Sequence, residues 1–257
     1  MKWVDYTNKD KIGTITIRRS EKRNALNDIV VRELKSAFVL AYSDANCKVI
    51  VLAAEGKVFS AGADLGYLEQ LQNNTFEENL EDSSSLASLF QLIYEGPKVV
   101  IAKIQGSAIA GGCGLATVCD FSIAVAKAQF GYTEVKIGFI PAIVSYFLLR
   151  KLGEAKTREL LLTGRIIEAK EAQEIGMITK VVKDEKLDEA IQDLSEELIK
   201  NCSSMALNST KQLISSLFDK NLEEAMKYTS EMNAKARASA DCKKGIGAFL
   251  AKEKIVW

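Results

Sequence analysis

Residues 106–125, GSAIAGGCGLATVCDFSIAV, decide how this sequence folds. They follow an apolar run, KVVIAKIQG (98–106), that is typical of a strand buried on both faces. Two consecutive glycines, Gly111 and Gly112, stand where a helix begins, and CDFSIAVA (119–126) then predicts a second strand. A strand, a helix and a strand in this order predict a β-α-β unit whose two strands lie parallel in one sheet.

The same alternation continues toward the N-terminus. KVIVLAAEG (48–56) predicts another buried strand, and GTITIRR (13–19) predicts an earlier one. Residues 26–44 predict a helix with Asn27 as its N-cap, because apolar side chains recur every three or four positions. From Glu154 onward the pattern is mainly helical. We therefore expect an α/β core, residues 1–200, followed by a C-terminal helical region, residues 201–257.

Composition excludes several kinds of chemistry. Lys plus Arg and Asp plus Glu both number 34, so no net charge indicates nucleic acid or a membrane surface as a partner. The chain has no histidine, which excludes Ser-His and Cys-His nucleophile pairs and zinc sites with imidazole ligands. There are five cysteines without a C-x-x-C pair, no signal-peptide pattern and no apolar span. These features predict a cytoplasmic protein without a metal site.

The glycine pair allows two interpretations. The free N–H groups of a helix start, reinforced by the helix dipole, can stabilise negative charge on a ligand that approaches the glycines closely. Glycine also permits close packing of a helix on a strand. The spacing does not match the dinucleotide-binding fingerprint. A second glycine turn, FSAGADL (59–65), places Asp64 at an expected helix start and is by itself typical of a tight turn.

Glu134 is a candidate proton shuttle. In AQFGYTEVKIGFIPA (128–142) it lies among apolar and aromatic residues. Burial in such surroundings raises the pKa of a carboxyl group, because desolvation disfavours the charged form. The alternative interpretation is an exposed glutamate at the end of a strand.

Five segments, in the same order along the chain, resemble the crotonase superfamily, the enoyl-CoA hydratase/isomerase family. They are RRSEKRNALN (18–27), FSAGADL (59–65), residues 106–141, residues 160–182 and GIGAFLAKEK (245–254). Together they cover nearly the whole chain. The resemblance implies a spiral of β-β-α units with C-terminal helices that join copies of the chain into a homotrimer or homohexamer.

The resemblance also implies a site for an acyl-CoA thioester, in which coenzyme A is part of the substrate and no separate cofactor is used. The backbone N–H groups of Ala63 and Gly111 would bind the thioester oxygen and stabilise an enolate. Glu134 would be the general acid or base. The positions that match coenzyme A contacts are Lys22, Arg23, Ala25, Ala61, Ala63, Phe249 and Lys252. In the family the residues at the last two positions often come from a neighbouring subunit.

Two departures from the family pattern bear on the reaction. Gly114 stands where many hydratases carry a second glutamate, and residues 142–145 replace a glycine-rich stretch, which makes the acyl pocket bulkier and drier. We expect reversible addition of water to a 2-enoyl-CoA, and the departures resemble a branched-chain subset, the methylglutaconyl-CoA hydratases. Two alternatives stay open: a double-bond isomerase that uses Glu134 alone, and an acyl-CoA-binding subunit without catalysis.

Other polar residues near these motifs receive no catalytic role. Tyr132, Ser145 and Glu69 each carry a hydroxyl or carboxyl group that is a candidate helper. Such residues are more often structural, so none is assigned chemistry. Asp120 is interpreted as a structural hydrogen-bonding residue at the turn into the strand that follows it.

Overall fold

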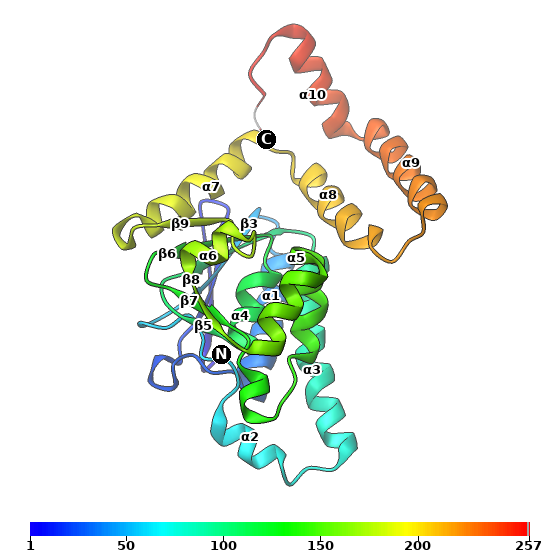
Figure 1. Cartoon of the computed structure of the whole chain (residues 1–257). Helices are drawn as coiled ribbons and strands as arrows, with labels where there is room; N and C mark the ends of the chain where they lie inside the picture. Colours follow the sequence, from blue (N-terminus) through cyan, green and yellow to red (C-terminus); the bar gives the residue numbers. More distant parts are fainter. Residues whose placement is uncertain (256) are drawn as a thin grey trace.

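A computed structural model describes residues 1–255 and 257. They form a mixed α/β core from which the last helices project as an arm (Figure 1). The strands are β1 (Val4–Lys9), β2 (Ile12–Ile17), β3 (Val49–Ala54), β4 (Val99–Ile104), β5 (Ala108–Ile109), β6 (Phe121–Val125), β7 (Gln129–Gly131), β8 (Ile166–Glu168) and β9 (Lys180–Val182).

The α-helices alternate with these strands and then continue alone. They are α1 (Asp28–Ser43), α2 (Leu65–Leu71), α3 (Phe76–Glu95), α4 (Gly111–Val118), α5 (Ala142–Thr163), α6 (Ala169–Glu174), α7 (Leu187–Asn201), α8 (Ser204–Leu217), α9 (Leu222–Ala238) and α10 (Ala240–Ala251). Three short 3-10 helices complete the set: η1 (Ser20–Lys22), η2 (Glu134–Ile137) and η3 (Asp184–Lys186).

The larger sheet has six strands in the order β1-β2-β3-β4-β6-β9. Every neighbouring pair from β2 to β9 is parallel, which confirms the prediction of a largely parallel sheet. Strand β1 was not predicted, and it pairs antiparallel with β2. Asp10 and Lys11, both at positive φ, form the two-residue turn between them. Asp-Lys lacks the glycine that marks most such turns, so the hairpin signal was weak.

A smaller sheet, in the order β5-β7-β8, stands beside the larger one and was also not predicted. Strands β5 and β7 are parallel, and β8 is antiparallel to β7. They have only two or three residues each, too few for an alternating pattern to stand out in the sequence. This sheet matters because β5 leads directly into α4 and β7 leads toward Glu134.

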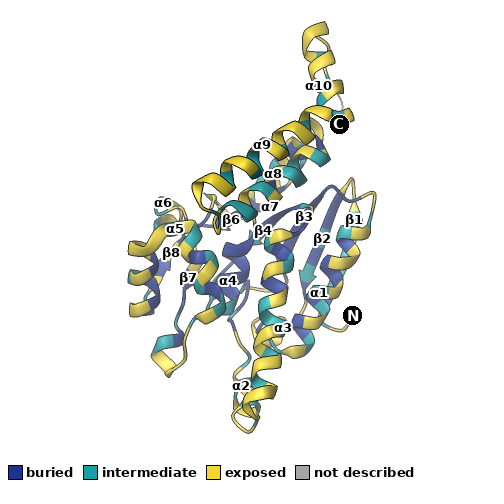
Figure 2. Ribbon diagram, turned by 90° about the vertical axis from the view of Figure 1, so that its right-hand side faces the viewer, coloured by how far each residue is buried: buried dark blue, intermediate teal, exposed yellow. Residues whose placement is uncertain are grey.

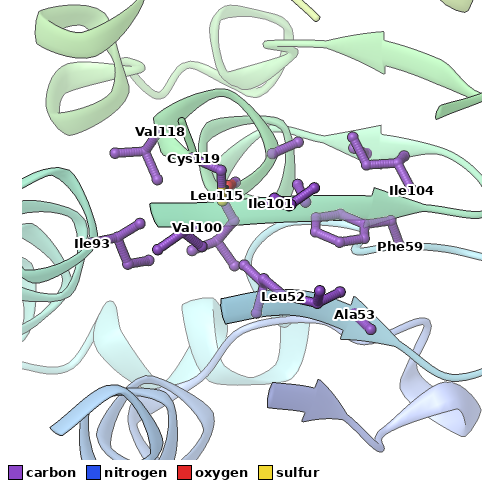
Figure 3. Close-up of a cluster of buried hydrophobic side chains, with 14 of the residues drawn as sticks. Leu52, Ala53, Phe59, Ile93, Val100, Ile101, Ile104, Leu115, Val118 and Cys119 are labelled. Atoms are coloured by element: carbon purple, nitrogen blue, oxygen red, sulfur yellow. Dashed lines mark hydrogen bonds between the residues drawn. The ribbon is translucent and has the colours of Figure 1, made fainter. Parts of the chain in front are cut away.

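The core lies between the larger sheet and the helices that cover it. Figure 3 shows how side chains of β3, β4 and α4 meet, among them Leu52, Ile101 and Leu115, which are completely buried. Helix α1 adds an apolar face and begins at the predicted N-cap, since the Asn27 Oδ1 atom accepts a hydrogen bond from the Val30 N–H at 3.0 Å. Close packing on α4 leaves little room for side chains along that helix.

Helices α8, α9 and α10 form the arm, which extends away from the core and is mostly exposed (Figure 2). Helix α7 ends at Asn201, where the sequence places the start of the C-terminal region, and the division into two parts stays a prediction. Neither α9 nor α10 has a buried residue among those described. None of the helices in the described part of the chain is long and apolar enough to cross a membrane.

Candidate active site

Three chain segments run side by side at the edge of the smaller sheet. Ser60 and Ala108 form a parallel bridge, in which the Ile109 N–H donates to the Ser60 carbonyl at 2.9 Å. On the other side β5 pairs with β7, and the Ala110 N–H donates to the Gly131 carbonyl at 2.7 Å. Because the three segments run in the same direction, the residues that follow them emerge together. The sequence-predicted Ala63, Gly111 and Glu134 are those residues.

The bridge between Leu26 and Ala63 sets the direction of the Ala63 N–H. The Leu26 N–H donates to the Gly62 carbonyl at 2.7 Å, and the Asp64 N–H donates to the Leu26 carbonyl at 2.8 Å. In such a parallel pair the residue between the two bonded ones directs its own N–H and carbonyl to the opposite side. The Ala63 N–H therefore points away from Leu26, and it has no acceptor among the described residues.

The Gly111 N–H lies next to this loop. Gly111 is the first residue of α4, whose opening N–H groups have no acceptor within the helix. Gly62 has a φ of +86°, and a Cβ atom built on it would lie 2.8 Å from the Ala110 Cβ and 3.4 Å from the Gly111 nitrogen. Only glycine allows this approach, which brings the two loops into contact. Ala110 itself adopts φ 50° and ψ −125°, an unusual conformation for a residue with a side chain.

Glu134 is a buried carboxylate at the start of η2, with 8% of its surface exposed. Its Oε2 atom has no hydrogen-bond partner among the described residues. Burial raises the pKa of Glu134, and a hydrogen bond from its own backbone acts in the opposite direction without cancelling that effect. A buried carboxylate oxygen without a partner is unusual, because structural carboxylates at such depth are normally hydrogen-bonded, and this makes Glu134 a candidate functional group.

The segment expected to contact coenzyme A folds against the same loop. The Ala25 N–H donates to the Lys22 carbonyl, and the Ala61 N–H donates to the Arg23 carbonyl, both at 3.0 Å. The Lys22 and Arg23 side chains are exposed, whereas Ala25 is buried. Two cationic side chains thus stand in solvent close to the chain that leads to Ala63, a suitable place for the phosphates of a nucleotide.

Comparison with known proteins identifies the family. Residues 7–257 match the family described as Enoyl-CoA hydratase/isomerase. The chain belongs to this family.

Individual relatives agree with that assignment over nearly full length. A Thermus thermophilus protein provisionally named an enoyl-CoA hydratase is 39% identical over 95% of this chain and 96% of its own. The crotonyl-CoA hydratase of Syntrophomonas wolfei is 32% identical over 96% of this chain and 94% of its own. The crystal structure of an enoyl-CoA hydratase from Shewanella pealeana aligns with a TM-score of 0.93 at 32% identity, covering 99% of this chain and 96% of that one. The mixed α/β fold is thus the crotonase fold that the sequence resembled, and the chain is an enzyme of the hydratase/isomerase family.

Gly114, where many members of the family carry a second glutamate, faces a filled space. A Cβ atom built on Gly114 would lie 2.3 Å from the Val144 Cγ1 and 2.7 Å from the Phe90 Cε1. Real Cβ atoms do not approach other atoms so closely, so no side chain fits at this position without movement of Val144 and Phe90. The glycine is required by packing against the buried Val144 and Phe90, so a glutamate side chain does not fit at this position.

Gly112 also proves to be a packing residue. A Cβ atom built there would lie 2.5 Å from the Ser60 carbonyl oxygen. Of the two interpretations of the glycine pair, close packing thus explains Gly112. Packing does not explain Gly111, where a Cβ atom would meet only Leu26 at 3.5 Å. Glycine at 111 is tolerated rather than demanded.

None of the three candidate helper groups is hydrogen-bonded to Glu134 among the described residues. The Tyr132 hydroxyl is buried and lies 2.9 Å from the Thr117 Oγ1, and burial raises its pKa well above the usual value. The Ser145 hydroxyl donates to the Ala142 carbonyl, and Glu69 is exposed on α2. Asp120 is structural, as predicted, because its Oδ2 accepts from the Val100 N–H at 2.7 Å.

Phe249 and Lys252 are the predicted site residues that the fold does not bring near the others. They lie at the end of α10, at the opposite end of the molecule from α2, which begins directly after Ala63 and Asp64 (Figure 1). Phe249 is 83% exposed. Within one chain these two residues therefore make no part of the candidate site.

Some residues around the candidate site belong to no recognisable sequence motif. Phe90 and Val144 lie on different helices, and only their contact with Gly114 shows their importance. Arg19 forms a buried ion pair with Asp64, although in the sequence it looks like half of an exposed Arg-Arg pair. The only sequence feature that indicated a buried role for Arg19 is its charge at the end of a segment that otherwise looks like a strand.

Proposed function

We propose that this enzyme adds water reversibly to a 2-enoyl-CoA thioester, with Glu134 as the only acid/base group and Ala63 and Gly111 as donors to the thioester oxygen. The observation that carries the proposal is the buried Glu134 Oε2 without a partner, beside two N–H groups that also lack one. The names of the relatives, most of them enoyl-CoA hydratases, support water as the second substrate.

A single carboxylate is sufficient for the whole reaction. Ionised Glu134 takes a proton from water while the water oxygen forms a bond to C3, and the π electrons move to the thioester oxygen as an enolate. The Ala63 and Gly111 N–H groups stabilise that charge, each contribution being worth roughly 3 kcal/mol in a preorganised site. Glu134, now protonated, returns the same proton to C2 as the enolate reverts to the thioester. One hydroxyl and one hydrogen are added, and no cofactor is needed.

Val144 and Phe90 form an apolar wall beside Gly114, which favours an apolar branch on the acyl chain. Val144 and Phe90 fill the space beside α4 where a second carboxylate would stand. A branched 2-enoyl chain is the substrate class that we infer from this wall and from the resemblance to methylglutaconyl-CoA hydratases. A wall without polar groups holds a methyl branch better than a water network, because burying apolar surface is favourable.

Isomerisation of a 3-enoyl-CoA is the second candidate, since one carboxylate can move a proton between C2 and C4. Incubating the enzyme with 2-enoyl and 3-enoyl thioesters in ¹⁸O-labelled water separates the two. We expect label in a 3-hydroxyacyl product; a shifted double bond without label would instead establish the isomerase. Binding of both thioesters without any turnover would establish the acyl-CoA-binding subunit.

The role of Glu134 is tested by replacing it with glutamine. Glu134→Gln should lower turnover by at least about 100-fold, the usual contribution of a general acid/base, while acyl-CoA binding stays nearly intact. Glu69→Gln is the matched control, because Glu69 is an exposed glutamate on neighbouring α2 and should keep wild-type activity. Full activity of Glu134→Gln would refute the mechanism.

We further propose that the arm joins copies of the chain into a homotrimer or homohexamer. Helices α8, α9 and α10 expose large apolar side chains that a neighbour would cover: Ile214, Phe218, Leu222, Met226, Ile246, Phe249 and Leu250. A cavity of about 1280 Å³ also separates the arm from α4 and α5. In such an assembly Phe249 and Lys252 would reach the coenzyme A of a neighbouring site. The cytoplasmic location and the exclusion of nucleic-acid and membrane partners stay predictions.

A further inference from the structure

A buried ion pair lies directly beside the Ala63 donor. The Arg19 Nη2 and the Asp64 Oδ2 are 2.5 Å apart, and the two side chains are only 10% and 12% exposed. The preceding residue, Arg18, shows the contrast, since its ion pairs with Asp5 and Glu55 are about half exposed. Burying two charges costs several kcal/mol per ion, so such a pair adds little net stability. A buried pair at this place calls for another explanation.

Asp64 is fixed by both its backbone and its side chain. Its N–H donates to the Leu26 carbonyl, and its Oδ1 caps α2 by accepting from the N–H groups of Gly66 at 2.9 Å and Tyr67 at 3.3 Å. The other carboxylate oxygen is left for Arg19. Burial raises the pKa of Asp64, but the Arg19 guanidinium and the two backbone donors outweigh it, so the net pKa lies below the usual value.

Arg19 connects this loop to the one that precedes α1. Its Nη1 donates to the Ala25 carbonyl at 2.8 Å, and its backbone N–H donates to the Asn24 Oδ1 at 3.0 Å. Asn24 is fully buried and donates in turn to the Glu55 and Val58 carbonyls. The guanidinium thus adds a charged connection between two loops that the Asn24 side chain and the Ser60 hydroxyl already join by hydrogen bonds.

Ala63 has no anchor of its own, because its methyl side chain is exposed. Its N–H direction is set by its two neighbours: the Gly62 carbonyl, in the same peptide plane, accepts from the Leu26 N–H, and Asp64 is held by its own bond to Leu26 and by Arg19. We propose that Arg19 and Asp64 are positioning residues that hold the Ala63 N–H toward the thioester oxygen, an inference that rests on the proposed function. A misplacement of about 1 Å can cost roughly 100-fold in rate, so a small rotation of the Gly62–Ala63 peptide would lower the rate measurably.

The kinetic test uses conservative variants. Asp64→Asn keeps an N-cap of equal quality but removes the charge, and Arg19→Lys keeps the charge but loses the fork that bridges Asp64 and Ala25. We expect kcat to fall by about 10- to 100-fold in Asp64→Asn and by less in Arg19→Lys, with KM within about threefold of wild type. Arg18→Met, which removes the adjacent exposed ion pairs, should retain wild-type kcat.

A spectroscopic test separates positioning from general loosening. Crotonyl-CoA with a ¹³C thioester carbon is bound to Glu134→Gln, which does not turn it over, and its carbonyl stretch is recorded in infrared difference spectra. Binding should lower the stretching frequency, and the added Asp64→Asn change should remove most of that lowering at equal occupancy. Unchanged frequency together with unchanged kcat would overturn the proposal. If wild-type enzyme shows neither hydration nor a lowered frequency, the proposed function itself is wrong.

Discussion

At the scale of single residues, the burial of Glu134 governs how the enzyme responds to pH. The group works as a base only when ionised, and burial raises its pKa. We therefore expect the acidic limb of the kcat/KM profile to lie above the usual pKa of a glutamate, about 4.3. The measurement is the pH dependence of hydration in buffers of constant ionic strength. An acidic limb at or below the usual glutamate pKa would mean that another group titrates.

The same burial predicts that the active site weakens the fold. Between the unfolded pKa and the raised native pKa of Glu134, the native state binds more protons, so stability falls as pH rises through that window. Glu134→Gln should therefore be more stable than wild type at neutral pH and equally stable below the unfolded pKa. Each kcal/mol gained would raise the Tm by about 2–4 °C in calorimetry. If Glu134→Gln and the wild type have the same Tm at neutral pH, burial of the Glu134 carboxylate does not destabilise the fold.

Gly114 gives a second prediction at this scale. Gly114→Ala places a Cβ atom against Val144 and Phe90, and overpacking of this kind costs about 1–3 kcal/mol. The double variant Gly114→Ala with Val144→Ala should recover part of that loss in urea unfolding, because the Val144 Cγ1, the nearest atom, is removed while Phe90 stays in place. Additive losses in the double variant would show that the two positions do not compete for it.

At the scale of elements, lysine side chains from distant parts of the chain cap the C-terminal ends of four helices. The last carbonyls of a helix lack partners and carry partial negative charge, so a cation stabilises them. Lys48 donates to carbonyls at the end of α7, Lys98 at the end of α1, Lys151 at the end of α4 and Lys211 at the end of α3. Lys48 and Lys98 stand directly before β3 and β4, Lys151 lies on α5 and Lys211 lies on α8 of the arm, so the contacts connect distant segments.

Lys211 is the capping lysine with the strongest expected effect. It lies on α8, is 8% exposed, and donates to Asp120 as well as to the carbonyls of Ile93 and Lys98. Lys211→Met should destabilise the chain by about 2–4 kcal/mol, because it leaves Asp120 without its cation. Lys200→Met, which breaks an exposed pair with Glu196, is the control and should leave urea unfolding unchanged. An equally small effect of both variants would contradict the capping role.

At the scale of the whole molecule, the sequence was informative wherever one segment carries the signal by itself. Buried strands, the α1 helix and the glycine turns are visible in local pattern, so the parallel sheet could be predicted, and the apolar surroundings of Glu134 made it a candidate. Ala63 and Gly111 were expected at the site only through the resemblance to the family. What could not be predicted depends on contacts between distant segments. Examples are the two-residue strand β5, the contact of Val144 with Gly114, and the pairing of Arg19 with Asp64.

The separation of Phe249 and Lys252 from the rest of the site allows a test of the proposed assembly. If the arm of one copy completes the site of another, each site is built from two copies. Glu134→Gln then removes the acid/base group of one copy, and the double variant Phe249→Ala with Lys252→Ala removes the arm contacts that the other copy supplies. Both homo-oligomers should be weak, but oligomers co-assembled from equal amounts should regain about a quarter of wild-type activity, since symmetry pairs an intact Glu134 with an intact arm in that share of sites. Co-assembly of Glu134→Gln with Glu134→Ala is the control and should regain none. Mass measurements verify that the Glu134→Gln and arm variants co-assemble. If the mixed oligomers are then no more active than the two separate homo-oligomers, the arm does not serve a neighbouring site.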